Sequence, residues 1–275
     1  MSDPLSDWLR LREPVDAAAR SEALTRTIAD VMPEGAVHVL DLATGAGSNI
    51  RYLADRLPGR QRWLAVDRSA ALLAELRERM GLWVAERAEL EIEVETRQMD
   101  LGTLSDHAIF EGRHLVTASA LLDLASDGWL QALAAHCRAE GAAALFTITY
   151  NGYSSCDPGE PEDEMVRALF NQHQKTDKRL GGAAAGPEAA ALAERHFAAA
   201  GYQVRRAPSN WSLGPGESGV QRLLVDGWAH AATEMAPEHA ATIAAWRARR
   251  LAHVDAGRSR LVVGHDDFAA WLPGT

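Results

Sequence analysis

The chain has 275 residues, of which 47% are hydrophobic and 24% are charged; its net charge is −10 and its isoelectric point is near 5.5. A chain of this length and composition can bury one large core, so we expect a single domain over residues 1–275. The acidic balance argues against a general binder of nucleic acid or of anionic membranes, because attraction to phosphates needs a basic face. We therefore expect neither as a partner.

The two cysteines, Cys137 and Cys156, lie far apart, and neither belongs to a pair with the spacing of a zinc motif. We expect no disulfide bond and no metal site. Residues 1–4 do not read as a basic region before an apolar segment, so no signal peptide is expected. No apolar run approaches the length of a membrane span. Together these features predict a cytoplasmic protein.

The predicted elements begin with one or two helices over residues 7–31, interrupted at 12–16, with Pro14 in the first turn of the second helix. Strands and helices then alternate. We predict strands at residues 37–42, 63–66, 90–97, 115–118, 142–149, 202–206 and 260–263. We predict helices at residues 50–56, 70–82, 127–136, 164–174, 188–200, 218–233 and 237–254. This alternation favours an α/β fold with a mostly parallel sheet and helices on both of its faces.

The most informative stretch follows the first predicted strand. It consists of small residues that let the backbone turn sharply and lie against a ligand, namely Ala43, Thr44, Gly45, Ala46 and Gly47. Ser48 and Asn49 are suited to open the next helix. A strand, a turn of small residues and a helix N-terminus are typical of a site for a nucleotide-like ligand.

Two carboxylates narrow the choice of ligand. Asp67 ends the second predicted strand about twenty residues after Gly47, where an acidic residue usually accepts the ribose hydroxyls. This leaves a dinucleotide or S-adenosylmethionine. Asp41 stands at the end of the first strand, before the glycines, where the dinucleotide motif needs no carboxylate. At that place it could meet the ammonium group of S-adenosylmethionine, directly or through water.

Residues 41–47 resemble the first motif of the class I S-adenosylmethionine-dependent methyltransferases, acidic-x-Gly-x-Gly-x-Gly, with Ala43 in place of the first glycine. Asp67 matches the ribose-binding acid of that family, and residues 98–101 and 114–122 resemble its third signature and fourth strand. The resemblance covers roughly residues 5–150. It implies a three-layer, Rossmann-like sheet of seven mostly parallel strands with an antiparallel last strand, which we place at residues 260–263 on the sheet edge.

The resemblance also implies where the cofactor binds. We expect the helices of residues 1–33 to cap it, with Arg12, Asp16 and Arg20 facing the methionine carboxylate or the substrate. The predicted cofactor-binding residues are Arg12, Arg20, Asp41, Ala43, Thr44, Gly45, Gly47, Asn49, Asp67, Arg68, Asp100, Leu101, Ser119 and Ala120.

Methyl transfer from a sulfonium is an in-line displacement that needs a general base only when the nucleophile is protonated. The candidate catalytic residues are Asp123, Tyr150 and His173. The candidate substrate-binding residues are Leu122, Asn151, Tyr153, Asn210 and Trp211. Residues 151–187 are predicted to leave the fifth strand as a loop and to form a lid. The acidic residues next to His265 are predicted to lie in a solvated turn after an edge strand.

These features predict S-adenosylmethionine-dependent methyl transfer to a small-molecule acceptor through an oxygen, nitrogen or carbon nucleophile. One alternative is a nicotinamide-dependent oxidoreductase, although the full dinucleotide glycine pattern and a tyrosine–lysine pair are not evident. Another is a non-catalytic scaffold that binds the cofactor. The two late helices offer a surface on which two copies could form a homodimer.

Overall fold

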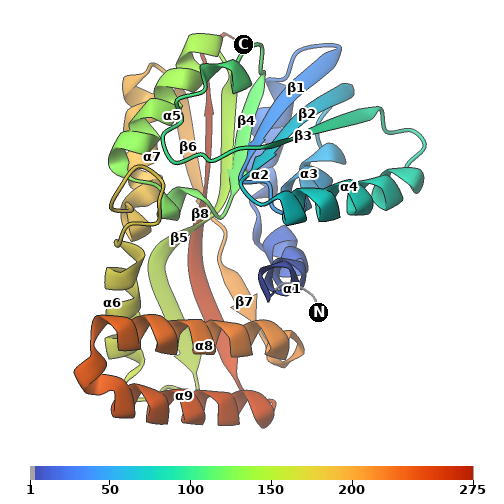
Figure 1. Cartoon of the computed structure of the whole chain (residues 1–275). Helices are drawn as coiled ribbons and strands as arrows, with labels where there is room; N and C mark the ends of the chain where they lie inside the picture. Colours follow the sequence, from blue (N-terminus) through green and yellow to red (C-terminus); the bar gives the residue numbers. More distant parts are fainter. Residues whose placement is uncertain (1–3, 275) are drawn as a thin grey trace.

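The computed structural model describes residues 4–274 and shows a twisted sheet flanked by helices (Figure 1). The strands are β1 Ala36–Leu42, β2 Arg60–Asp67, β3 Ile92–Gln98, β4 Leu115–Ser119, β5 Ala143–Asp157, β6 Gln203–Pro208, β7 Trp211–Leu213 and β8 Arg260–Trp271. The helices are α1 Pro4–Ala19, α2 Glu22–Asp30, α3 Ser48–Ala54, α4 Ala70–Ala85, α5 Asp127–Glu140, α6 Asp163–Gln174, α7 Ala189–Ala199, α8 Ser218–Met235 and α9 Ala240–Asp255. The predicted α/β alternation is confirmed.

The strands lie in the order β3-β2-β1-β4-β5-β8-β6, and β7 pairs with β8 beyond the end of β6. The pairings among β1 to β5 are parallel, whereas β8 is antiparallel to β5, β6 and β7. The Rossmann-like sheet with an antiparallel last strand is therefore confirmed. The place of that strand at the sheet edge is wrong, because β8 lies between β5 and β6.

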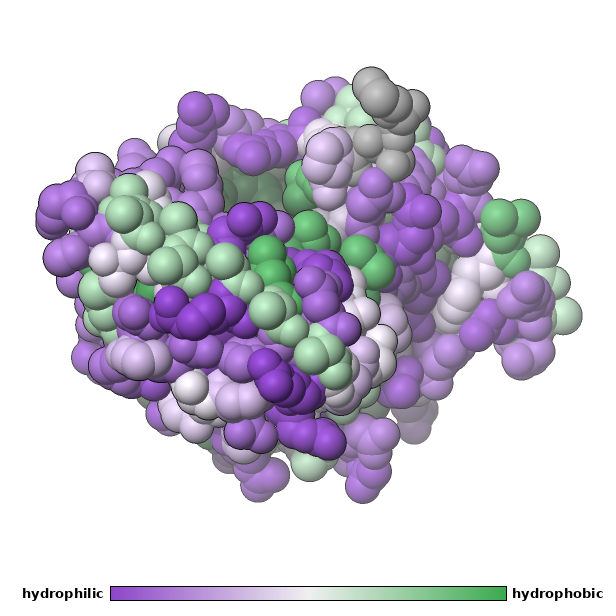
Figure 2. Space-filling view, turned by 90° about the horizontal axis from the view of Figure 1, so that it is seen from below, coloured by the Kyte–Doolittle hydropathy of each residue, from purple (hydrophilic) through white to green (hydrophobic). Residues whose placement is uncertain are grey.

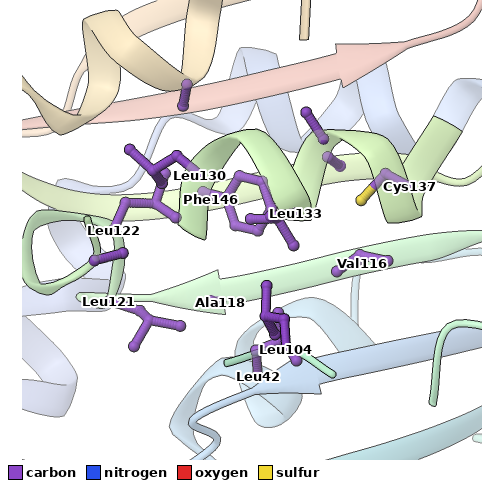
Figure 3. Close-up of a cluster of buried hydrophobic side chains, with 14 of the residues drawn as sticks. Leu42, Leu104, Val116, Ala118, Leu121, Leu122, Leu130, Leu133, Cys137 and Phe146 are labelled. Carbon is purple, nitrogen blue, oxygen red and sulfur yellow. The ribbon is translucent and has the colours of Figure 1, made fainter. Parts of the chain in front are cut away.

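Alternating side chains of the strands face two cores. Leu40 and Leu42 of β1 face the core covered by α5 and α7, and Val37 and Val39 face the core covered by α2, α3 and α4. Figure 3 shows the first core where Leu130 of α5 packs near the side chains of the sheet. Both faces of β1 therefore carry buried apolar side chains, as expected for a strand buried on both sides.

A third hydrophobic core lies where β5 and β8 continue past the parallel sheet (Figure 1). There the strands pack against α6, α8 and α9, with Trp228 and Trp246 among the buried residues. Seen from below, the surface of this part is mostly hydrophilic with scattered hydrophobic residues (Figure 2). No helix within residues 4–274 has the length and apolar composition that crossing a membrane requires.

The prediction of a loop after residue 149 is wrong, because β5 continues to Asp157 beside β8. Its register shifts twice, and Ile148 and Gly152 have left-handed φ values of 55° and 88°. A bulge of this kind bends a strand without ending it. The predicted solvated turn around His265 is also wrong, because this residue lies within β8 and is 5% exposed.

The predicted break in the first helix is wrong as well. Helix α1 runs through Pro14 and ends at Ala19, and Ser21 caps α2 by accepting a hydrogen bond from the backbone N–H of Leu24. Pro14 is exposed, so the carbonyl that loses its helical hydrogen bond can be solvated. Residues 1–3 of the predicted cap lie outside the described residues.

Asp267 fixes the bulge in β5, because its Oδ1 accepts a hydrogen bond from the backbone N–H of Ile148 at 2.8 Å and its Oδ2 accepts one from Ser21 at 2.8 Å. The side chain is fully buried. We expect Asp267→Ala to lower the free energy of unfolding by about 2–5 kcal/mol, because two buried donors lose their acceptor. Chemical denaturation measures this. The control Asp266→Ala, with only long contacts to its neighbours, should cost less than about 1 kcal/mol; equal losses would contradict the assignment.

Candidate functional site

The turn between β1 and α3 requires small residues. Ala43, Gly45 and Gly47 have φ values of 50°, 55° and 80°, in the left-handed region that disfavours larger side chains. A Cβ atom on Gly47 would lie 2.9 Å from Cγ of Leu76, so α4 leaves no room for a side chain there. Ala43 adopts the glycine-like conformation at the place where the resembled motif has its first glycine.

Asp41 lies beneath this turn and is fully buried. Its Oδ2 accepts a hydrogen bond from Thr44 Oγ1 at 2.5 Å, and its Oδ1 accepts one from Asn49 Nδ2 at 2.6 Å. Burial raises the pKa of Asp41 to about 6, although the two hydrogen bonds and nearby Arg20 act in the opposite direction. Since both oxygens already have side-chain partners, Asp41 holds the turn in shape.

Arg20 connects this carboxylate network to β4. Its guanidinium donates to Asn49 Oδ1 at 2.7 Å and to Ser119 Oγ at 3.0 Å, and it stacks on the ring of Tyr52. The side chain is 5% exposed. The predicted role of Arg20 at the methionine carboxylate therefore has no support in the geometry; the residue supports the site from beneath.

Asp67 reaches the same turn from the end of β2. The backbone N–H of Gly45 donates to its Oδ2 at 2.9 Å, and that of Ser69 donates to its Oδ1 at 2.8 Å. Each carboxylate oxygen can accept more than one hydrogen bond, so Asp67 keeps capacity for ligand hydroxyls. Beside it, Asp100 is exposed, and the backbone carbonyl of Leu101 accepts a hydrogen bond from Trp129 Nε1 at 2.7 Å.

A cavity of about 300 Å³ opens above these residues. Among the residues predicted to bind the cofactor, those that line it are Arg12, Asp41, Ala43, Thr44, Gly45, Asn49, Asp67, Arg68, Asp100, Leu101, Ser119 and Ala120. The structure thus brings together residues from the ends of β1, β2, β3 and β4. The two predicted residues that do not line the cavity are Arg20 and Gly47.

Helix α1 forms one wall of the cavity through Leu5, Leu9 and Arg12. Within this helix Arg12 donates to Asp16 at 2.9 and 3.2 Å, and Trp211 Nε1 of β7 donates to Asp16 at 3.1 Å, which links the helix to β7. These contacts explain why the cap sits over the cavity. They also show that Arg12 already has a carboxylate partner.

Lys178, Arg179 and Leu180, in the connection between α6 and α7, also line the cavity. Sequence analysis placed a lid in this part of the chain but named none of these three residues as site residues. It also missed Leu9 and Met99, which line the cavity. The polar, glycine-rich composition of the connection was the available signal, and it gave no indication of which side chains face the ligand.

None of the three candidate catalytic residues is among the described residues that line the cavity. Asp123, in the turn after β4, is 7% exposed, and burial raises its pKa to about 6. Its Oδ1 has no hydrogen-bond partner among the described residues. Tyr150 donates its hydroxyl proton to Asn171 Oδ1 at 2.8 Å. His173 lies 3.0 Å from Glu234 through Nε2.

The candidate substrate-binding residues are also absent from the described lining of this cavity. Leu122 is buried in the core, and Asn210 accepts a hydrogen bond from the backbone N–H of His265. Asn151 and Tyr153 lie on the continuation of β5, where Tyr153 is 50% exposed. Trp211 is buried in the third core. Within residues 4–274, no cluster of three or more histidine, cysteine or acidic side chains could hold a metal ion.

Comparisons with known proteins agree with this arrangement. Residues 39–141 match the family model described as "Methyltransferase domain". The cyclopropane synthase MmaA2 from Mycobacterium tuberculosis has a similar fold, with 13% identity, a TM-score of 0.51 and coverage of 98% of this chain and 94% of that one. A methyltransferase from Geobacter sulfurreducens, solved with S-adenosylhomocysteine, is 18% identical with a TM-score of 0.45, covering 96% and 98% of the chains.

No curated protein matches the chain significantly. The matched segment runs from β1 to the end of α5 and contains the turn above Asp41, the end of β2 and the loop after β4. The sequence match to a methyltransferase domain covers residues 39–141, and over the rest of the chain the comparison with the cyclopropane synthase shows a similar fold.

Proposed function

We propose that this protein binds S-adenosylmethionine in the cavity above β1 and β2 and transfers its methyl group to a small-molecule acceptor. The observation that supports this most is the position of Asp67, whose carboxylate is fixed by two backbone N–H groups at the cavity lining and can still accept hydrogen bonds from ribose hydroxyls. The comparisons lend no support to an oxidoreductase or to a non-catalytic scaffold.

The lining residues suit the parts of this cofactor. Asp100 and Leu101 would lie beside adenine, and the backbone of residues 43–45 would lie against the amino-acid part, where a Cβ on Gly45 would meet Leu9 at 3.2 Å. The cofactor would supply an activated methyl group on a sulfonium. Helix α1 and residues 178–180 cover the cavity from two sides, so they would orient the reactants and exclude water.

Asp123 is our candidate for the general base. Its neighbours in the chain, Leu121 and Leu124, line the cavity, and its unpartnered Oδ1 could accept a proton from an acceptor hydroxyl or ammonium. A carboxylate with a pKa of about 6 is a better base near neutral pH than an ordinary one. Tyr150 lies close enough to influence the charge of Asp123, but burial raises its pKa, so it would stay protonated.

Binding of S-adenosylhomocysteine tests the cofactor site. We expect calorimetry to give a dissociation constant in the micromolar range, roughly −8 kcal/mol, and no binding of oxidised nicotinamide dinucleotide. Asp67→Ala should weaken binding by at least about 1 kcal/mol, because charge-assisted hydrogen bonds to the ribose are lost. Asp55→Ala, an exposed aspartate outside the described cavity lining, is the control. If the Asp67 variant binds as tightly as the parent, the site is misplaced.

The ionisation of Asp123 can be tested without an acceptor. Because the folded-state pKa lies above the ordinary value, this group's contribution to stability is full below about pH 4 and is lost as pH rises through about 6. At pH 8 the free energy of unfolding of Asp123→Asn, which has no charge to bury, should be higher than that of the wild type by on the order of 3 kcal/mol. At pH 4 the difference should largely vanish. A difference that does not change with pH would mean that Asp123 titrates normally.

The catalytic role of Asp123 has its own test once a methyl-uptake screen has identified an acceptor. If that acceptor reacts through a protonated nucleophile, kcat/KM of the wild type should rise with pH through about 6, as the base loses its proton. Asp123→Asn should be slower by about 10²-fold or more and should not show this rise. A variant with the rate and pH profile of the wild type would exclude Asp123 as the base.

A further inference from the structure

The chain has an unusual distribution of lysine: it contains 26 arginines but only two lysines, Lys175 and Lys178. Both lie in the connection between α6 and α7. Lys175 is exposed and pairs with Glu188 at 2.7 Å. Lys178 is half-buried and lines the cavity assigned to the cofactor and acceptor. The two lysines thus differ in environment although they are three residues apart.

The backbone holds Lys178 in place against the loop after β4. The backbone N–H of Ser126 donates to the Leu180 carbonyl at 2.9 Å, and that of Ala185 donates to the Ala125 carbonyl at 2.7 Å. Gly181 has a φ of 85°, and a Cβ atom there would collide with Ser126. The segment is therefore packed on the start of α5 by hydrogen bonds on both sides of Gly181.

The ammonium group of Lys178 lies beside a histidine ring. Its Nζ lies 3.3 Å from Nδ1 of His173, whose Nε2 lies 3.0 Å from Glu234. An ammonium can only donate, so Nδ1 of His173 would be the acceptor of a hydrogen bond between the two side chains. No carboxylate within residues 4–274 lies within 4 Å of Nζ. The positive charge of Lys178 is therefore not neutralised by direct contact.

The other cations of the cavity differ from Lys178. Arg12 and Arg79 pair with Asp16 and Glu13, while Arg68 and Arg179 are exposed to solvent. Lys178 is half-buried, and desolvation lowers its pKa, while the charges of Glu234 and Asp123 act in the opposite direction. A partly desolvated ammonium gains more from an anionic ligand than a solvated one does.

We propose that Lys178 binds an anionic group, a carboxylate or a phosphate, of the methyl acceptor. This inference rests on the proposed function and specifies its substrate class. The acceptor would be bifunctional, with its anionic group at Lys178 and its nucleophilic atom toward the loop after β4. Arg12 and Arg79 would not compete for the anion, because their own carboxylates hold them.

Calorimetry on the wild type saturated with S-adenosylhomocysteine tests this proposal. Benzoate and phenyl phosphate serve as anionic probes, and benzamide serves as the neutral isostere of benzoate. We expect at least one anion to bind and benzamide to bind at least tenfold more weakly. Lys178→Met should weaken anion binding at least tenfold, whereas Lys175→Met should change it less than twofold. Lys175→Met should not change the affinity for S-adenosylhomocysteine by more than twofold, and each variant is saturated with S-adenosylhomocysteine before an anion is added. The anion that binds distinguishes a carboxylate from a phosphate acceptor.

A second readout uses the scarcity of lysine. A lysine-directed acylating reagent has only Lys175 and Lys178 as side-chain targets, and mass spectrometry can follow each. The bound anion should slow acylation of Lys178 at least fivefold and leave Lys175 unchanged. Equal anion binding by Lys178→Met and wild type, or no anion binding by a wild type that binds S-adenosylhomocysteine, would overturn the proposal. Failure to bind S-adenosylhomocysteine would overturn the proposed function itself, and the inference with it.

Discussion

The structure of the site depends on two carboxylates at the ends of neighbouring strands. Asp41 holds the turn after β1 from below through Thr44 and Asn49, and Asp67 holds it from the side through the backbone N–H of Gly45. A turn with three left-handed residues is costly to maintain, and these hydrogen bonds stabilise it. The rest of the site, from the cap of α1 to residues 178–180, is built around the position of this turn.

The parts that could be predicted from sequence are those whose determinants are local. The small residues 43–47 and Asp67 each follow an apolar strand, and parallel strands bring their carboxyl ends to one edge of the sheet. The extension of β5 and β8 could not be predicted, because it depends on pairing between segments more than a hundred residues apart. Gly152 and Gly264 look like turn residues in the sequence. In the structure, Gly264 instead allows the side chain of Asn151 from β5 to approach closely.

Dependence on pairing between distant segments also explains why the residues around the methyl acceptor were predicted less well than those around the cofactor. Asn151 and Tyr153 were expected in a loop, but they lie on the continuation of strand β5. The alternation of side chains along the strand sets their directions, and neither residue lines the cavity. Lys178 reaches the cavity only because residues 180 and 185 pair with the start of α5. Asp123 was recognisable as a candidate from its place after β4, but its burial depends on packing that sequence does not reveal.

The central claim is that the turn between β1 and α3, together with the ends of β2 and β3, forms a site for the adenosyl group. A crystal structure of the protein with S-adenosylhomocysteine tests it most directly. The account predicts the ribose hydroxyls within hydrogen-bond distance of Asp67 and the adenine ring between Asp67 and Asp100, with Gly45 against the amino-acid part. Adenosine bound elsewhere, or bound here without a contact to Asp67, would contradict it.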